Sequence, residues 1–458
     1  MSDLNPKKNL SVDLTQGSIH KHLIRMALPM MIGIAASMGF ILADTFFIGM
    51  LGPDELAAIG FVGPIAMVIV AASIGLGAGT SSVLARAVGS GDQQAMVKLA
   101  TNSFILAVLI SLIFTLIGLL TIDPLFTMMG ADENTLPLIR DYMLIWYWSP
   151  LFIIIPMVAM GVIRAMGDTS LQGKIMILAA LANVILDPIM IFGLFGFPRL
   201  ELAGAAYATL ITRAGSFIAV MYYLIYRFHV INFSTEILNS FKTSISKIMN
   251  VGIPAMGTNM IIPIAGGAVI AIIATFGNEA VAGTNVAMRM EAVFIIVFYA
   301  LSAVIGPFVG QNLGAGKHDR VEKALQQCAL FALIWGVFLA AAIAVIAPVI
   351  TRQFSDVIAI QDYANDYLYI MPISYGAYGF VMIANATFNG IGHPIPGVIV
   401  SSLRVALFQF PLVLVAAFIF DDMQYVYAAS SFSNLLAGII AYIWVMRSVR
   451  DMALKAPS

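Results

Sequence analysis

Long apolar blocks separated by short polar gaps dominate the chain. A membrane-spanning helix needs about 20 predominantly apolar residues, and twelve blocks are long enough. The pattern predicts twelve spans, at residues 24–51, 55–85, 94–122, 137–160, 170–195, 202–226, 246–275, 281–311, 320–350, 361–386, 395–420 and 423–447. The longest polar gap, residues 227–245, is too short for a soluble domain. We therefore expect an all-α integral membrane protein.

Composition supports the membrane assignment. Of the 458 residues, 60% are apolar and 10% are charged, whereas soluble domains are about 25% charged. The single cysteine, Cys328, excludes an internal disulfide, and a net charge of −1 does not indicate a nucleic-acid partner. The polar N-terminus lacks the short apolar core and cleavage site of a removable signal peptide. We expect a monomer in contact with membrane lipid, and no cofactor.

Positive charge sets the predicted orientation, because cytoplasmic loops carry an excess of Lys and Arg. With the N-terminus inside, most of the 23 Lys and Arg residues fall on the cytoplasmic side. Only Arg140, Arg199 and Arg352 fall outside, and the few others lie within spans. We therefore expect a multi-pass protein of the plasma (inner) membrane with both termini in the cytoplasm.

The sequence repeats itself once. Residues 28–58 align with 253–283, and the same shift of 225 residues pairs "VGSGD" (88–92) with "LGAGK" (313–317). Each half contains six spans, so both halves have the same orientation and form parallel repeats about an axis along the membrane normal. The Gly-rich loops lack the Lys-Ser/Thr pair of a P-loop, so we expect turns there rather than phosphate-binding loops.

Two pseudo-symmetric six-helix lobes around a central cleft are the predicted architecture. The N-terminal lobe spans residues 1–226 and includes a cytoplasmic N-terminal segment. A cytoplasmic linker, residues 227–245, joins it to the C-terminal lobe, residues 246–458, which ends in a short cytoplasmic tail. This architecture is typical of carriers that work by alternating access.

Asp44 is the first of several ionisable residues inside the predicted spans. A charge at the centre of a bilayer costs about 2.5–3.5 kcal/mol on insertion scales, so such residues face a partner or a cavity. Small and polar residues, including Gly33 and Ser37, share a helical face with Asp44. Pro29 removes one backbone hydrogen bond and is a candidate hinge. A structural role for Asp44, paired to a neighbouring helix, stays open.

Asp187 and Asn183 lie one turn apart in the fifth span, in "LANVILDPIM". The sixth span carries a small and polar stripe made of Ala205, Thr209, Thr212 and Ser216. Carboxylate, amide and hydroxyl oxygens suit Na⁺. They suit a proton equally, because burial and a like-charged neighbour both favour the protonated carboxyl group. The alternative is that Asn183 and Asp187 only hold helices together.

Four residues are candidates for the substrate cleft: Ser37, Asn259, Arg289 and Glu291. Arg289 and Glu291 are two positions apart in the eighth span, so they point in different directions. A structural salt bridge is an equally acceptable interpretation for this pair. Arg213 and Arg404 are less informative, since either could extend to the membrane surface or pair.

The motifs resemble those of multidrug and toxic compound extrusion (MATE) transporters. The evidence is the opening "LPMM…ADTFFIGMLG", the "VGSGD" and "IRAMGDT" loops, and "LANVILDPIMIFG", within two lobes of six spans. The resemblance covers nearly the whole chain. Spans 7 and 10 lack the acids of the NorM-type branch, so the DinF-type branch, with acids in the N-terminal lobe, fits better. The residues matching its cation-coupling pattern are Asp44, Tyr142, Asn183, Asp187, Ala205 and Thr209.

The resemblance implies efflux of cationic, amphipathic drugs by antiport with H⁺ or Na⁺ through alternating access. We favour H⁺; a Na⁺ ion would be held by Asp44, Asn183, Asp187 and Thr209. A flippase for a lipid-linked sugar or lipid is the alternative transporter, although it should need a more basic cleft. An intramembrane enzyme is disfavoured, because the sequence contains no H-E-x-x-H, G-x-G-D or G-x-S-G motif.

Overall fold

A computed structural model describes residues 13–234, 237 and 239–455. Over these residues the chain forms helices and turns, without a β-strand. Packing divides it into two units. The first contains Leu28–Met256, and the second combines Leu14–Ala27 with the chain from Gly257 onward. Most of the predicted N-terminal segment, and residues 235–236 and 238 of the predicted linker, lie outside the described residues.

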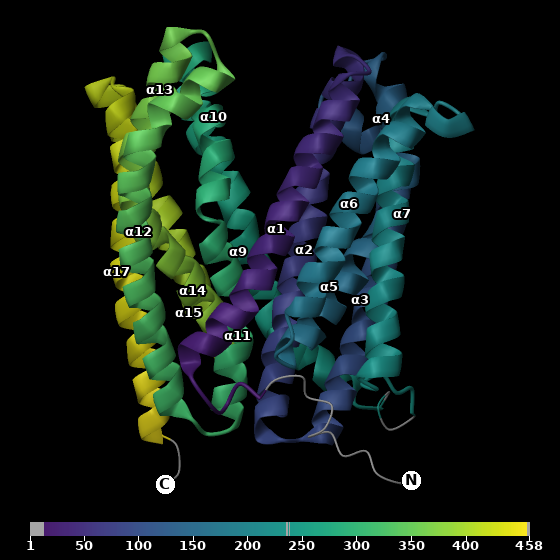
Figure 1. The fold of residues 1–458 in the computed structure, drawn as a ribbon, viewed down its shortest axis with the longest axis vertical. Helices are drawn as coiled ribbons and strands as arrows, with labels where there is room; N and C mark the ends of the chain where they lie inside the picture. The colour runs from purple at the N-terminus through teal and green to yellow at the C-terminus, as the bar shows by residue number, and fades with distance from the viewer. Residues whose placement is uncertain (1–12, 235–236, 238, 456–458) are drawn as a thin grey trace. The chain divides into compact units, whose positions relative to one another are not determined.

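The first unit contains six consecutive spans and the start of a seventh (Figure 1). Its helices are α1 (Ile19–Gly49, from Leu28 on), α2 (Pro53–Ser90), α3 (Gln93–Met128), α4 (Thr135–Trp146), α5 (Ser149–Ala165), α6 (Ser170–Phe192), η2 (Leu194–Gly196), α7 (Glu201–Tyr222), η3 (Tyr223–Arg227) and the first part of α9 (Phe241–Ile273).

The second unit holds the remaining helices and is more often interrupted. They are η4 (Ala274–Phe276), α10 (Asn278–Phe294), α11 (Ile296–Gly314), α12 (His318–Phe354), α13 (Ile358–Ile370), η5 (Met371–Ser374), α14 (Tyr375–Ile391), α15 (Ile395–Ser402), η6 (Leu403–Gln409), α16 (Phe410–Val415), η7 (Ala416–Phe420) and α17 (Met423–Lys455). The segments η6 and η7 are π-helical.

The prediction of twelve spans is confirmed. By length and composition, eleven helical stretches among the described residues could cross a membrane, and the pair α4 and α5 makes a twelfth. These two helices are bent by 45° at a short break. At the position related by the repeat, η5 separates α13 from α14. The two units are therefore consistent with the predicted two-lobe repeat.

The Gly-rich loops are turns, as their sequences predict. Gly91 ends α2 and Gly316 follows α11, and both have a left-handed backbone, with φ of 74° and 71°. A residue with a β-carbon adopts this conformation at a cost, so glycine is favoured at both. Asp92 then caps α3 by accepting a hydrogen bond from the Ala95 amide at 2.9 Å.

Close helix contacts recur in both units. A β-carbon on Gly161 of α5 would lie 2.6 Å from the Gly77 carbonyl oxygen of α2. In the second unit, a β-carbon on Gly390 of α14 would lie 2.5 Å from the Gly306 carbonyl oxygen of α11. Small residues let the backbones of membrane helices approach closely. Glycine at these positions therefore allows α2 to pack closely against α5, and α11 against α14.

The first helix of each lobe begins in the other packing unit. Leu14, which is fully buried, donates its amide to Gln311, and the Arg320 guanidinium donates to the carbonyl oxygen of Gly17 at 2.8 Å. In the first unit, the buried Asn102 side chain donates to the hydroxyls of Ser240 and Ser244 just before and within α9. The predicted lobes follow the sequence repeat, whereas the packing units exchange these two segments.

Candidate functional site

Helix α6 of the first unit carries two buried polar residues without partners. Asn183 and Asp187 lie one turn apart, and only 1% and 0% of their surfaces are exposed. Neither the Asn183 amide group nor either Asp187 carboxylate oxygen has a hydrogen-bond partner among the described residues. An unsatisfied buried group costs about 1–3 kcal/mol, so this pair calls for a functional explanation.

Asp44 of α1 lies within electrostatic range of this pair. The residue is half-buried, and its Oδ1 is buried without a partner among the described residues. Its charge interacts with those of Asp187 and Arg213. Arg213 of α7 lies over the Trp146 ring, 5.9 Å from the centroid. No ion pair within 4.0 Å joins Arg213 to Asp44 in the described part of the chain.

The other predicted coupling residues lie on α4 and α7 of the same unit. Tyr142 of α4 is buried and interacts electrostatically with Asp44 and Asp187. Thr209 and Ala205 lie on the buried face of α7, which packs along α6. The first unit thus brings Asp44, Asp187 and Tyr142 together.

The donor set of this site suits a proton or a hard monovalent cation. Among the described residues, no group of three or more His, Cys, Asp or Glu side chains could hold a metal ion. Two carboxylates with neutral amide and hydroxyl oxygens do not resemble the nitrogen and sulfur sites of zinc or copper. Whether Na⁺ or H⁺ occupies the site stays a prediction.

Pro29 and Ser37 lie on α1, on the N-terminal side of Asp44. α1 is continuous through Pro29, and a β-carbon on Gly173 of α6 would lie 2.4 Å from the Pro29 carbonyl oxygen. Pro29 follows directly on the point where α1 passes from the second packing unit to the first. Ser37 donates to the Gly33 carbonyl oxygen at 3.1 Å within its own helix. The hinge role of Pro29 stays a prediction.

The other substrate-cleft candidates lie in the second unit. Glu291 of α10 is half-buried and accepts hydrogen bonds from the hydroxyls of Tyr367 and Tyr375. Arg289 is exposed on the same helix, so the two residues point in different directions. Asn259 is half-buried on α9. The structure therefore brings Glu291 into a polar cluster without Arg289.

Arg404 joins the same unit's polar cluster, and its partners were not identifiable from the sequence. Its guanidinium donates to Asn434 Oδ1 at 3.0 Å and lies over the Tyr378 ring, 4.9 Å from the centroid. Asn434 in turn donates to Ser374 at 3.1 Å. These partners come from spans 10 and 12, which are distant in sequence. From the sequence, only the intramembrane charges of Glu291 and Arg404 indicated the cluster.

The chain has two parallel six-helix repeats, with ionisable residues buried inside their spans. This architecture identifies a membrane transport protein. The sequence model of the MatE family matches residues 29–189 and, a second time, residues 254–415. The chain belongs to the MATE family of transporters. The predicted MATE resemblance is confirmed, as is the prediction that the chain is not an enzyme, whereas the DinF-type branch stays a prediction.

Similar proteins have been named for different cargoes. The "FAD transporter" of Shewanella oneidensis is 35% identical over 434 residues, covering 95% of this chain and 96% of its own. The "Probable multidrug resistance protein YoeA" of Bacillus subtilis is 24% identical and covers 80% of each chain. A crystal structure of a variant of the Vibrio cholerae MATE transporter VcmN is 28% identical, with a TM-score of 0.90 over 94% of this chain and 97% of that one.

Proposed function

We propose that this transporter exports an amphipathic, aromatic small molecule in exchange for protons that bind to the acids of its first lobe. Alternating access of the two lobes moves the cargo. The observation that carries the proposal is Asp187, which is fully buried and has two unpartnered carboxylate oxygens, among the described residues, beside the charge of Asp44. Two buried carboxylates that interact electrostatically favour holding at least one proton.

Protonation supplies the driving force in this scheme. Each proton that enters is worth about 1.4 kcal/mol per pH unit, and about 2.3 kcal/mol per 100 mV of membrane potential. Protonating Asp44 or Asp187 removes charge from the first lobe and changes the relative stability of the two conformations. A ligand shifts such an equilibrium only by its differential affinity for the two states. Pro29 is the proposed hinge, because a helix lacking one hydrogen bond bends there more easily.

H⁺ is our preferred coupling ion, and Na⁺ is the alternative. The oxygen ligands fit both ions, but a buried carboxylate can take up a proton without any further ligand. A Na⁺ ion would additionally need Asn183 and Thr209 as neutral oxygen ligands.

A flavin dinucleotide is the first candidate cargo. The support is the relative named "FAD transporter", whose 35% identity extends over nearly the whole of both chains. Flavins are planar and aromatic, as are many drugs. Because a dinucleotide is anionic, it would not compete with protons for the same acids, and coupling would act through the conformational change.

Cationic, amphipathic drugs are the second candidate cargo. Relatives named for multidrug resistance support it, including YoeA of Bacillus subtilis. A cation could compete directly with protons for Asp44 and Asp187. A lipid-linked sugar or lipid as cargo is the remaining alternative; it would have to bind to groups other than these acids.

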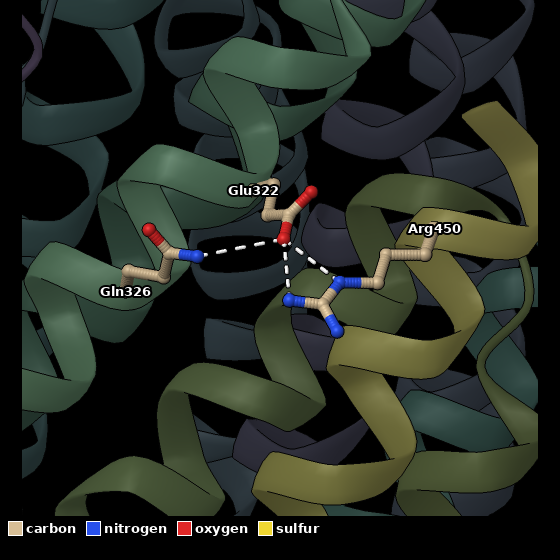
Figure 2. Close-up of polar contacts among 3 residues, drawn as sticks. All are labelled: Glu322, Gln326 and Arg450. Carbon is tan, nitrogen blue, oxygen red and sulfur yellow. Dashed lines mark hydrogen bonds and ion pairs between the residues drawn. The ribbon is translucent and has the colours of Figure 1, made fainter.

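We also propose an inner-membrane monomer with both termini in the cytoplasm. In support, Arg320 of the first turn of α12 binds the segment before α1, and Glu322 close to that turn binds Arg450 near the end of α17 (Figure 2). The described ends of the chain therefore lie at the same end of the second unit. Impermeant maleimide should label cysteines placed at Ser90 and Ala315 only from the cytoplasmic side, in a Cys328-free background.

Transport by purified protein in sealed liposomes tests the proposed function. A pH gradient alone should drive FAD movement, and a Na⁺ gradient alone should not. A cationic dye in parallel vesicles tests the second cargo. If only a Na⁺ gradient drives movement, Na⁺ is the coupling ion instead of H⁺. If the dye moves and FAD does not, the cargo is a cationic drug instead of a flavin dinucleotide. Movement of neither cargo under any gradient would contradict ion-coupled export.

A further inference from the structure

Arg404 of the second unit is a buried charge whose role the proposed function does not explain. Only 7% of its surface is exposed. One guanidinium nitrogen donates to Asn434, and the plane lies over the Tyr378 ring. The Nε–H group is buried and has no hydrogen-bond partner among the described residues. A guanidinium has five N–H donors, so this site leaves donor capacity unused.

No carboxylate of the described residues neutralises this guanidinium at close range. The ion pairs within 4.0 Å in the described part of the chain are Arg140–Asp123, Arg199–Glu201 and Arg450–Glu322. Glu291, an acid of the same cluster, is held by Tyr367 and Tyr375 instead. Arg404 and Glu291 interact electrostatically, but among the described residues they form no ion pair within 4.0 Å. The hydrogen bonds of these two opposite charges go to neutral partners instead.

The backbone departs from a regular helix at this residue. Arg404 lies in η6, a π-helical segment, between α15 and α16. The repeat relates η6 to the middle of α6, which is an uninterrupted α-helix. π-Helical turns are rare and occur frequently at functional sites. The first lobe therefore has no such departure at the position that corresponds to Arg404.

We propose that Arg404 binds an anionic group of the cargo, a phosphate, with Tyr378 supporting the guanidinium from one side. The assignment rests on the proposed flavin dinucleotide cargo and names the residue that recognises its diphosphate. Asn434 is a positioning residue, because it holds the guanidinium through one N–H group and is itself held by Ser374.

The chemistry of the cluster fits such a cargo. A guanidinium presents paired N–H donors that match two phosphate oxygens, and these charge-assisted bonds are stronger than neutral ones. The carboxylate of Glu291, which is half-buried, can accept further hydrogen bonds from amino or hydroxyl groups. The first lobe, in contrast, offers two acids and suits the coupling ion.

Flavin binding to the full-length protein in phosphatidylcholine nanodiscs tests the proposal. FAD and riboflavin share the ring system, but only FAD carries phosphate, so the ratio of their dissociation constants isolates the phosphate contribution. The wild type should bind FAD at least about tenfold more tightly than riboflavin, the size expected of one charge-assisted contact. Arg404→Gln should reduce the ratio to about one, and Arg404→Lys should retain part of it.

Arg352→Gln is the matched control, because Arg352 is exposed on α12 of the same unit; its ratio should equal that of the wild type. Since the ratio does not depend on how much protein is folded, a purely structural role for Arg404 would leave it unchanged. An unchanged ratio in Arg404→Gln would therefore overturn the proposal. Equal binding of FAD and riboflavin by the wild type would overturn it too.

An incorrect flavin cargo can be distinguished from an incorrect role for Arg404. If the wild type binds neither flavin, the proposed FAD cargo is wrong, and ADP becomes the probe. ADP binding that Arg404→Gln abolishes would keep the phosphate site, and absence of ADP binding would overturn it. Loss of the phosphate preference in phosphatidylglycerol nanodiscs, together with no ADP binding, would assign Arg404 to a lipid headgroup and overturn the cargo site.

Discussion

The two lobes share a sequence repeat but differ in how far their buried ionisable residues are hydrogen-bonded. In the first lobe, Asn183 and Asp187 are buried with no hydrogen-bond partner among the described residues. In the second, Glu291 is bonded by two tyrosine hydroxyls, and Arg404 is bonded by Asn434. A group without fixed partners is free to exchange an ion, whereas a bonded group has a fixed position suited to recognition. Under the proposed function, the duplication allows ion coupling and cargo recognition to separate between the lobes.

The backbones differ at the same places. Span 5, helix α6, carries Asn183 and Asp187 on a single continuous α-helix. Its repeat counterpart, span 11, is divided by η6 and η7. Span 8 is likewise broken at Ile295, between α10 and α11, whereas its counterpart α2 is continuous. Irregular backbone costs hydrogen-bond quality, so its concentration in the lobe with the bonded polar cluster points to a shaped site there.

Removing the charge of Asp44 should have the largest effect. Asp44→Asn keeps the size of the side chain but cannot take up and release a proton. It should insert and fold normally, since an amide is cheaper to bury than a carboxylate. A one-proton exchanger gains about tenfold accumulation per pH unit, and this variant should lose that gain entirely. Cargo accumulation in liposomes under an imposed pH gradient is the measurement, and Asp44→Glu should retain part of it.

Glu291→Gln in the second lobe tests whether ion coupling is confined to the first lobe. If the lobes divide the tasks as proposed, this variant should weaken cargo binding but keep the same dependence on the pH gradient as the wild type. Near-normal accumulation by well-expressed Asp44→Asn protein would refute the coupling role. Loss of the gradient dependence in Glu291→Gln would instead place ion coupling in both lobes.

Asn183 and Asp187 should act as one unit. Their positions on one face of α6 and their shared burial predict that Asn183→Ala and Asp187→Asn each impair coupled transport. The double variant should be little worse than Asp187→Asn alone, because residues of one site are not additive. Transport rates of the four proteins in a double-mutant cycle measure this. Fully additive losses in barrier free energy would show that the two residues serve separate roles.

The sequence predicted the spans well and singled out the buried acids, for physical reasons. Twelve apolar blocks must cross the bilayer as helices, and an acid inside one of them is conspicuous. Asp44 and Asp187 were therefore identifiable, and the repeat isolated them, because it pairs Asp44 with Val269. Their mutual electrostatic interaction in the structure follows from the packing of α1, α4, α6 and α7, which no local pattern encodes.

The second-lobe cluster could not be predicted in the same way. Tyrosine, asparagine and serine are common in membrane helices, so Tyr367, Tyr378 and Asn434 did not stand out. They meet around the 3₁₀ turn η5 and the π-helical segment η6, and π-helical turns have no clear sequence pattern. The exchange of the first segments of α1 and α9 between packing units was also unpredicted, because a sequence repeat says nothing about which neighbour a helix contacts.

The close contact between α2 and α9 should respond moderately to substitution. A β-carbon on Gly79 would lie 2.4 Å from the Ile248 carbonyl oxygen, so the helices must separate in Gly79→Ala. Overpacking of this kind costs about 1–3 kcal/mol. The repeat places the buried Val304 at the corresponding site of the second lobe, so the requirement for glycine is specific to the first. Thermal unfolding in detergent should show a lower midpoint.

Gly60→Ala on the same helix is the control, since a β-carbon added there would meet no other atom within 4 Å. It should be neutral or slightly stabilising, because alanine favours helix more than glycine does. Equal midpoints for the Gly79 and Gly60 variants would show that α2 and α9 can separate without loss. The exchanged segment would then be loosely held rather than packed as part of the first unit.

The ion pair between Glu322 and Arg450 should have the smallest effect. Both Arg450 contacts, at 2.8 and 2.7 Å, and the amide of Gln326 converge on one oxygen, Glu322 Oε1 (Figure 2). The side chains of Glu322 and Arg450 are 28% and 59% exposed, so water and salt screen the attraction. Such pairs contribute about 0–1 kcal/mol. Glu322→Gln should therefore lower the unfolding midpoint slightly at low salt and not at high salt. The corresponding residue of the first lobe is Val97, which cannot form an ion pair. A loss of unfolding free energy well above about 0–1 kcal/mol would therefore mean that the second lobe depends on a polar contact that the first lobe lacks.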